Sequence, residues 1–517
     1  MLPSHNRSEW YYLPYLRSGG FIMLREWSPH SEYKEKLRLE MMMYYGMQRS
    51  RVIDLDKSIA KLYLLNLDPL LPVVKPLYPD FGRPAINQQG IIRSLVLMLD
   101  QQVYSITKWA RKVAADPLLA AICGFKAADA PATASYYDLL SRYWKRNHKI
   151  RKFKLKYFTS KPKKKLKKGE KLAPKHPEIV KRLVQKALQG KLHTVRPEVI
   201  LQKLIARCVV DTSTQMGLLG NTQAFSVAFD GTTFYSGASH YGIKVCDCRS
   251  EGIYDCKCPR LFSDPDARWG WDSYREQWFF GNMLFNVTAS DSPYDLPIHI
   301  KMVQASRHDS ITTIFALLEL KELYPSITWK SFLADGAMDN YPTYELLKHF
   351  GIDPFISLDA RTKAKFHCPH PDVLAFDNQN QPLCQAGNPF VYWGRCKPYR
   401  LKYRCWFAAK GLEPPKECRC SNSKYGKTIY LKPDDDPRMF TPVPRNTKAF
   451  KEKFKTRTTV ERTNKRMFED YAIEEYDARS AMIRTSLAAF AVVNIHLDAW
   501  VKHTGFKFAG LLEAPAA

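Results

Sequence analysis

The sequence predicts a mixed α/β protein. A mixed sheet carries helices on its faces, an all-α region precedes it, and a β-rich insertion interrupts it. Three observations support this prediction. Residues 80–149 place apolar residues at three- and four-residue spacing, which is typical of helices. From about residue 224, runs of β-branched and aromatic residues alternate with amphipathic helices. Residues 362–450 hold Pro, Gly, Cys and short β-like runs instead.

Chain length and net charge limit the classes of protein to which this sequence can belong. A chain of 517 residues is too long for one ordinary core, so two or three domains are expected. The 79 basic and 51 acidic residues give a net charge of +28, which favours a polyanionic partner, most often nucleic acid. The apolar runs are too short to cross a membrane, and the first residues lack a secretory signal pattern. A cytoplasmic, nucleoid-associated location is therefore expected.

The region before the sheet is predicted to be helical. Residues 1–79 carry no functional signal that we can identify. Residues 80–149 predict several short helices, with a break where Pro117 follows Asp116. Short helices joined by tight turns fit a helix-turn-helix DNA-binding domain, and the same pattern fits a plain helical bundle.

Residues 150–222 are predicted to form a basic linker followed by more helices. The run from residue 151 to residue 171 carries 11 Lys or Arg and one Glu. Because like charges repel, this run is expected to be a flexible linker, or a segment that becomes ordered only on an anion. It can act as an arm along the phosphate backbone of DNA or as a solvated linker, and the pattern leaves both open.

The predicted sheet comes from residues 223–361 and is completed by helices within residues 451–505. The pattern is three strands, then helix, strand, helix and strand, over residues 224–237, 277–289, 296–306, 310–325, 327–338, 340–351 and 352–359. A helix near the end of the chain, over residues 478–504, has an almost entirely apolar centre and is expected to be buried.

Two aspartates follow predicted strands. Asp230 comes after the apolar run "FSVAF" and Asp335 comes after "SFLA", and each is followed by Gly. A strand that leads into Asp-Gly places the carboxylate at the end or edge of the strand, beside a flexible backbone. Asp-Gly is also a common turn pair, so either residue alone can be a turn residue.

A third acid lies on a late helix. Arg457, Glu461 and Lys465 stand four residues apart, so they share one helix face. For an isolated helix this spacing indicates only surface ion pairs. Three carboxylates that meet at one sheet edge repel one another, and a divalent cation relieves that repulsion. Two Mg²⁺ or Mn²⁺ ions held in this way support phosphodiester chemistry.

Three segments resemble the acidic motifs of bacterial insertion-sequence DDE transposases, which have an RNase-H-like core. They are "VAFDGTTF", "SFLADGAMDNYPTYELLKHFGIDPFISLDAR" and "RTTVERTNKRMFEDY". The resemblance covers roughly residues 80–500 and implies that Asp230, Asp335 and Glu461 form a metal-binding catalytic triad. It also implies a helical DNA-binding domain before the core and a β-rich insertion, here residues 362–450, before the Glu.

The Glu motif of many relatives reads Tyr, two residues, Arg, three residues, Glu, six residues, Lys. Arg457 and Glu461 match it, whereas Phe454 and Phe468 occupy its Tyr and Lys positions. Lys465, one helical turn earlier, can take the basic role. Arg457 and Lys465 are therefore predicted to hold phosphate or to orient Glu461.

Cysteines are clustered within a predicted insertion over residues 240–275. Cys246, Cys248, Cys256 and Cys258 form two Cys-x-Cys pairs that can hold one structural Zn²⁺ across a hairpin, or remain free thiols. A second set in residues 367–420 has irregular spacing and is a weaker zinc candidate. His308 and Asp309 precede a predicted helix, where Asp309 can act as its cap.

The predicted function is that of a DNA transposase, which cuts and joins the ends of its own mobile element. It would use Mg²⁺ or Mn²⁺, bind terminal-repeat and target DNA, and act as a homodimer, as the resemblance implies. Two alternatives stay open. One is an RNase-H-like nuclease without strand transfer, and the other is a zinc-stabilised DNA-binding protein that is not an enzyme.

Overall fold

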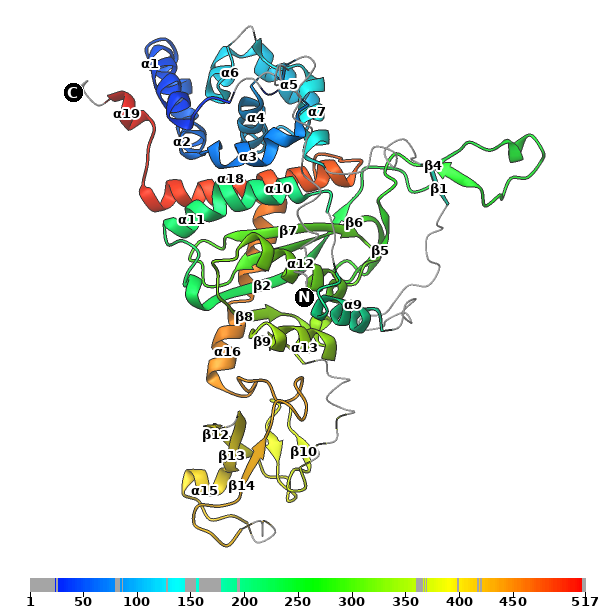
Figure 1. Ribbon diagram of the computed structural model, residues 1–517, viewed down its shortest axis with the longest axis vertical. Coiled ribbons are helices and arrows are strands. Elements are labelled where there is room, and N and C mark those ends of the chain that lie inside the picture. Colours follow the sequence, from blue (N-terminus) through cyan, green and yellow to red (C-terminus); the bar gives the residue numbers. More distant parts are fainter. Residues whose placement is uncertain are drawn as a thin grey trace, which may run out of the picture.

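The structure is a computed structural model, and Figure 1 shows three parts along its long axis. Helices from the first part of the chain lie at one end, a sheet lies in the middle, and the β-rich insertion lies at the other end. The described residues are 24, 27–79, 84–85, 87–126, 129–144, 155–157, 178–192, 196–358, 366, 368, 370–397, 399–415, 418 and 421–513. The predicted basic arm lies outside these residues, apart from 155–157.

The first part is built from helices: α1 (His30–Asp54), α2 (Asp56–Leu64), α3 (Leu71–Val74), α4 (Gln88–Asp100), α5 (Ile106–Ala115), α6 (Pro117–Cys123) and α7 (Thr133–Tyr143). Polar side chains cap several of them. Asp116 accepts hydrogen bonds from the backbone amides of Leu118 and Leu119, and Pro117 occupies the first turn of α6. The predicted helix break at Pro117 is confirmed.

The central sheet has six strands: β2 (Phe225–Tyr235), β5 (Arg268–Asp272), β6 (Gln277–Ala289), β7 (Pro297–Gln304), β8 (Trp329–Ala334) and β9 (Asp353–Ile356). β6 pairs with β2 on one edge and with β5 and β7 on the other, always antiparallel. On the far side of β2, β8 and β9 add in parallel. The predicted mixed sheet and its order of strands and helices are confirmed.

Helices cover this sheet. α12 (Asp309–Leu323) packs on β2 and β7, and α13 (Tyr341–His349) packs on β9 and α12. α9 (Ile179–Leu188) lies against both helices. The connection into the sheet comprises α10 (Val199–Leu204), the π-helical segment η4 (Ile205–Val210) and α11 (Asp211–Gln215).

The long helix α18 (Ala481–Thr504) lies between the sheet and the helices of the first part (Figure 1). It packs on β7 on one side and on α2 and α4 on the other. Its residues Leu487–Leu497 are buried all round, as the apolar sequence predicts. One continuous hydrophobic core therefore joins the first helices, α18 and the sheet.

The β-rich insertion has a hydrophobic core of its own. It contains β10 (Ala375–Phe376), β11 (Pro382–Leu383), β12 (Phe390–Cys396), β13 (Arg400–Cys405), α15 (Trp406–Lys410) and β14 (Thr428–Leu431). The chain then returns to the sheet through α16 (Lys448–Lys455), α17 (Thr458–Lys465) and the π-helical segment η8 (Arg466–Asp470).

A cysteine-rich arm projects from the sheet between β2 and β5 (Figure 1). It contains β3 (Ile243–Lys244), the 3₁₀ turn η6 (Asp247–Arg249) and β4 (Pro259–Leu261). β4 also pairs with β1 (Leu155–Tyr157), which belongs to the basic linker. The arm and the linker are thus joined by backbone hydrogen bonds.

Candidate active site and metal site

Asp230 lies inside β2, opposite Asn286 of β6. The expectation that it ends its strand is not met, because β2 continues to Tyr235 along β6. The parallel strand β8 is shorter. Its Leu333 pairs with Ala228, so β8 ends beside Asp230. Asp230 therefore marks the point where the parallel half of the sheet stops.

Asp335 is the first residue after β8. Its carboxylate caps the 3₁₀ turn η7 (Gly336–Met338) by accepting a hydrogen bond of 2.9 Å from the backbone amide of Ala337. Because β2 and β8 run in the same direction and their pairing stops beside Asp230, the two aspartates come to the same end of the paired segment.

Glu461 lies on α17, which packs across β2 and β6. The helix turns Val460, Thr463 and Asn464 into the protein and leaves the Glu461 side chain 47% exposed. Arg457, one turn earlier, donates a hydrogen bond to the Glu461 carboxylate. The predicted pairing of Arg457 with Glu461 is thus present.

Lys465 does not reach the Glu461 carboxylate. It pairs with Glu469 at 3.4 Å, and both of these side chains are largely exposed. The two positions at which the predicted Glu motif has Tyr and Lys hold packed rings instead. Phe454 stacks on Phe450 and Phe468 packs edge-on against Phe234.

Two ion pairs fix the helices around Glu461 to the loop between β6 and β7. Arg462 makes two hydrogen bonds to the carboxylate of Asp295, at 2.7 and 2.6 Å. Lys453 of α16 pairs with Asp291 at 2.7 Å. Paired, two-point contacts of this kind define orientation as well as distance. They hold α17 against the strands β2 and β6, beside Asp230.

The carboxylates lie within electrostatic range of one another. Burial, together with the nearby charges of Asp335 and Glu461, raises the pKa of Asp230 to about 7, and the Arg457 charge opposes this rise. Like charges disfavour ionisation of their neighbours. The structure therefore brings Asp230, Asp335 and Glu461 to the same end of the sheet.

A fourth acid, Asp309, belongs to this group and was not among the predicted site residues. Burial and, to a smaller extent, the charges of Asp335 and Asp230 raise its pKa to about 7. A Cβ atom on Gly231 would lie 2.9 Å from a carboxylate oxygen of Asp309, so glycine permits this close approach. The helix cap is supplied by His308, whose ring accepts a hydrogen bond from the amide of Ser310. In the sequence, an acid at the start of a helix is most simply explained as an N-cap. The place of Asp309 among the other carboxylates therefore could not be recognised.

Asn464 was also missed. Its side-chain amide donates a hydrogen bond of 3.2 Å to the Asp230 carboxylate, and its oxygen accepts one from Asn286. Asn464 thus ties α17 to both β2 and β6, and it orients Asp230 toward the same helix that carries Glu461. A single buried Asn on a basic helix gives no sequence signal for this contact.

The four carboxylates are spaced more widely than the ligands of one tight metal site. Within the described ranges, only the arm cysteines bring three or more His, Cys, Asp or Glu ligand atoms within 4.8 Å of one another. Mg²⁺ usually takes one or two carboxylates and completes its shell with water and substrate phosphate. Two such ions lie roughly 3.5–4 Å apart in enzymes that use them.

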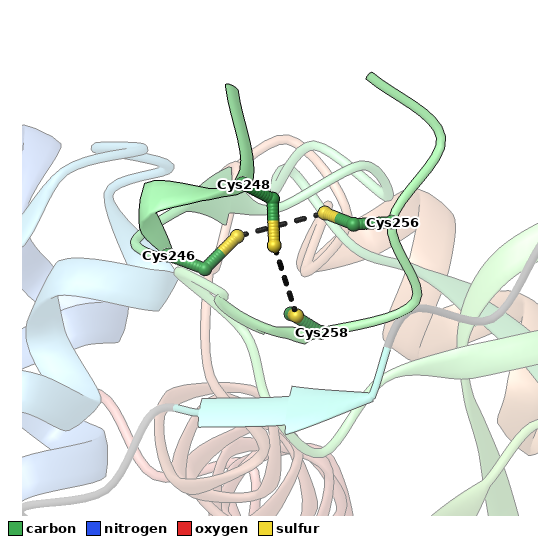
Figure 2. Close-up of side chains that lie close together, drawn as sticks. All are labelled: Cys246, Cys248, Cys256 and Cys258. Atoms are coloured by element: carbon green, nitrogen blue, oxygen red, sulfur yellow. Dashed lines mark hydrogen bonds between the residues drawn. The ribbon is translucent and has the colours of Figure 1, made fainter. Parts of the chain in front are cut away.

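The arm cysteines form a compact four-thiol group (Figure 2). Cys246 and Cys248 flank the start of η6, and Cys256 and Cys258 lie in the loop that leads into β4. The Sγ atoms of Cys246 and Cys256 are 3.5 Å apart, and those of Cys248 and Cys258 are 3.6 Å apart. A tetrahedral Zn²⁺ with Zn–S bonds of about 2.3 Å has sulfur–sulfur edges of about 3.8 Å. The group can therefore hold a metal ion such as zinc.

The second set of cysteines shows no such arrangement in the part of the chain that the structure describes. Cys384, Cys405 and Cys418 are buried in the insertion, and His367 and Cys420 lie outside the described residues. Among the helices that are described, none is both long and apolar enough to span a bilayer.

The chain matches no protein-family model, no curated protein and no solved structure.

Proposed function

We propose that this protein is a DDE transposase with an RNase-H-like catalytic core, which cleaves the ends of its mobile element and joins them to target DNA. The observation that carries the proposal is the convergence of Asp230, Asp335 and Glu461 from two neighbouring strands and a helix. Each residue lies within a motif that resembles the corresponding transposase motif.

The order of the elements agrees with this proposal. Three antiparallel strands in the order β7, β6 and β2 are followed by the parallel strands β8 and β9, with α12 and α13 as the connections. The two aspartates come from β2 and the end of β8. The β-rich insertion enters the chain after β9 and leaves before Glu461, which is where the resemblance implies it.

In the proposed site the residues of the chain have separate tasks. Asp230 and Asp335 would bind divalent ions, with Asp309 beside them and Asn464 orienting Asp230. Glu461 would complete the second ion's ligands, and Arg457 would orient Glu461 or neutralise a phosphate. Divalent ions bound there would activate a water or a 3′-hydroxyl and stabilise the leaving oxygen.

A zinc ion on the cysteine-rich arm and a DNA partner also belong to this proposal. A Zn²⁺ on the four arm cysteines would be structural, because all four positions of its shell are filled by protein. The net charge of +28 supports binding to terminal-repeat and target DNA. Holding two element ends together would require a homodimer.

Strand transfer distinguishes the transposase from its first rival. Pre-cut DNA ends, taken from the sequence that flanks the coding region, are incubated with a supercoiled target plasmid and Mg²⁺ or Mn²⁺. Joined products are expected for the wild-type protein. Nicking without joined products would identify an RNase-H-like nuclease instead, and no metal-dependent cleavage at all would favour a DNA-binding protein without activity.

The triad is tested by Glu461→Gln, which keeps the shape of the side chain and removes its charge. Cleavage is expected to fall by at least about a hundred-fold, since loss of a key electrostatic group typically costs that much, while binding to the same DNA persists in EDTA. Glu469→Gln is the matched control, because this acid lies on the next helical turns and is largely exposed. Equal losses in both variants would contradict the assignment.

A further inference from the structure

The outer face of the insertion's three-stranded sheet is the most distinctive surface away from the acid group. The strands β12, β13 and β14 pair antiparallel, and alternate residues of β13 point to opposite faces. Leu401, Tyr403 and Cys405 are buried on the inner face. The other face of β13 carries cations at every second position, and they are Arg400, Lys402 and Arg404.

Exposed aromatic rings lie among these cations. The Arg400 guanidinium is 4.8 Å from the ring of Tyr430, which belongs to β14 and pairs opposite Lys402. The Arg404 guanidinium contacts two rings, 4.8 Å from the centre of the Trp393 ring and 3.8 Å from that of Tyr425. These rings remain accessible, with exposed fractions of 45% for Trp393, 42% for Tyr425 and 37% for Tyr430. Cations and rings thus share one face of the sheet.

A β-bulge places Trp393 on this face. The pairing of β12 with β13 shifts between Tyr392 and Gly394, which leaves Trp393 without a partner opposite. Gly394 has a φ of 119°, which only glycine adopts readily. Exposing a large ring adds nothing to the insertion's own hydrophobic core. Its position is therefore better explained by an external ligand than by folding.

The three cations have no acidic partner within the described residues. Arg400 and Arg404 donate to backbone carbonyls of Lys397, Tyr425 and Ala408, and Lys402 donates to the Tyr425 hydroxyl at 2.9 Å. Elsewhere exposed cations such as Arg49, Arg207 and Lys348 pair with carboxylates. The uncompensated charge on this face favours a polyanion.

We propose that this face binds single-stranded nucleic acid, with phosphates on Arg400, Lys402 and Arg404 and unpaired bases stacked on Trp393 and Tyr430. Basic grooves with interleaved aromatic rings bind single strands because every base has a face that can stack. In a duplex the bases are already stacked on one another, so the rings would gain nothing there. This inference goes beyond the proposed function, since it needs no activity of the acid group.

The test uses the full chain, with fluorescence anisotropy of a labelled oligothymidine and of a labelled duplex, both in EDTA. Replacing Arg400, Lys402 and Arg404 together by Ala is expected to weaken oligothymidine binding about ten-fold or more. It should also make binding less dependent on salt, because fewer counterions are released. The double variant Trp393→Leu with Tyr430→Leu keeps the charge, and it is expected to weaken oligothymidine binding about five-fold or more while duplex binding stays unchanged.

A matched control removes three exposed cations elsewhere, through Lys36→Ala, Arg49→Ala and Arg207→Ala, each of which pairs with a carboxylate. It should change oligothymidine binding little. The proposal is overturned if control and charge variant lose affinity equally, if the aromatic variant binds oligothymidine like wild type, or if an acidic peptide competes as well as oligothymidine. Because EDTA removes divalent ions, these results are independent of cleavage by the acid group.

Discussion

At the scale of single residues, Asp309 shows how the acid group lowers the stability of the folded protein. Its ordinary pKa of 3.8 is raised to about 7, first by burial and then by Asp335 and Asp230. The unfolded chain therefore loses its proton at a lower pH than the folded protein does. The resulting penalty is absent below about pH 4, grows as the pH rises, and is complete above about pH 7.

Asp309→Asn removes this penalty. In the absence of divalent ions, the variant should match wild type near pH 4 and exceed it above pH 7 by on the order of 1–3 kcal/mol in free energy of unfolding. The measurement is thermal or urea unfolding at both pH values in EDTA. Adding Mn²⁺ at pH 8 should stabilise wild type more than the variant, because an ion relieves the repulsion among the carboxylates.

The control for this comparison is Glu469→Gln, a change at a largely exposed acid, which should alter stability by less than about 0.5 kcal/mol at either pH. If Asp309→Asn were as stable as wild type above pH 7, the carboxylate would not be part of a repelling group.

At the scale of elements, the cysteine-rich arm is expected to depend on a bound metal ion for its folding. The arm exposes Ile243, Val245 and Tyr254 and contributes only short strands, so it has little core of its own. Cys248→Ser should abolish stoichiometric zinc in protein purified without added metal, as measured by elemental analysis. It should also make residues 243–261 sensitive to protease, because metal binding supplies the folding free energy of such small sites.

Cys396→Ser is the matched control, since this half-buried cysteine lies on β12 away from the arm. Its zinc content should equal that of wild type. A wild-type protein without zinc would remove the metal assignment, and zinc retained by Cys248→Ser would assign the metal to other ligands.

Elements with strong periodicity could be predicted from the sequence, and contacts between distant elements could not. The strands β2, β6 and β7 and the buried helix α18 follow from local patterns of apolar residues. The pairing of β1 with β4 joins segments about a hundred residues apart along the chain, and neither segment has a distinctive pattern. Likewise, the sequence motifs identify Asp230, Asp335 and Glu461 as candidate site residues. Asp309 and Asn464 joined the site only through packing.

At the scale of the whole molecule, the described residues form a large core, a separate smaller one in the insertion, and a small cluster between the sheet and the helices α16 and α17. The first helices, α18 and the sheet share a single hydrophobic core, whereas the insertion packs around its own. Polar contacts join the insertion to the main body. Arg438 pairs with Asp339 at 2.8 Å, and Lys348 pairs with Asp434 at 2.6 Å. Hydrophobic packing makes each core cooperative, so the two cores are expected to open separately.

Two substitutions of the same kind distinguish these cores. Leu401→Ala in the insertion and Leu497→Ala in α18 each remove a buried side chain, at a cost of about 2–5 kcal/mol. Native-state hydrogen exchange should speed up only within residues 370–440 for Leu401→Ala. For Leu497→Ala it should speed up in α2, α4, α18 and β7 together, because these elements pack in one core. Each variant serves as the control for the other. Faster exchange in β2 and β8 after Leu401→Ala would show that the insertion and the sheet unfold as one unit.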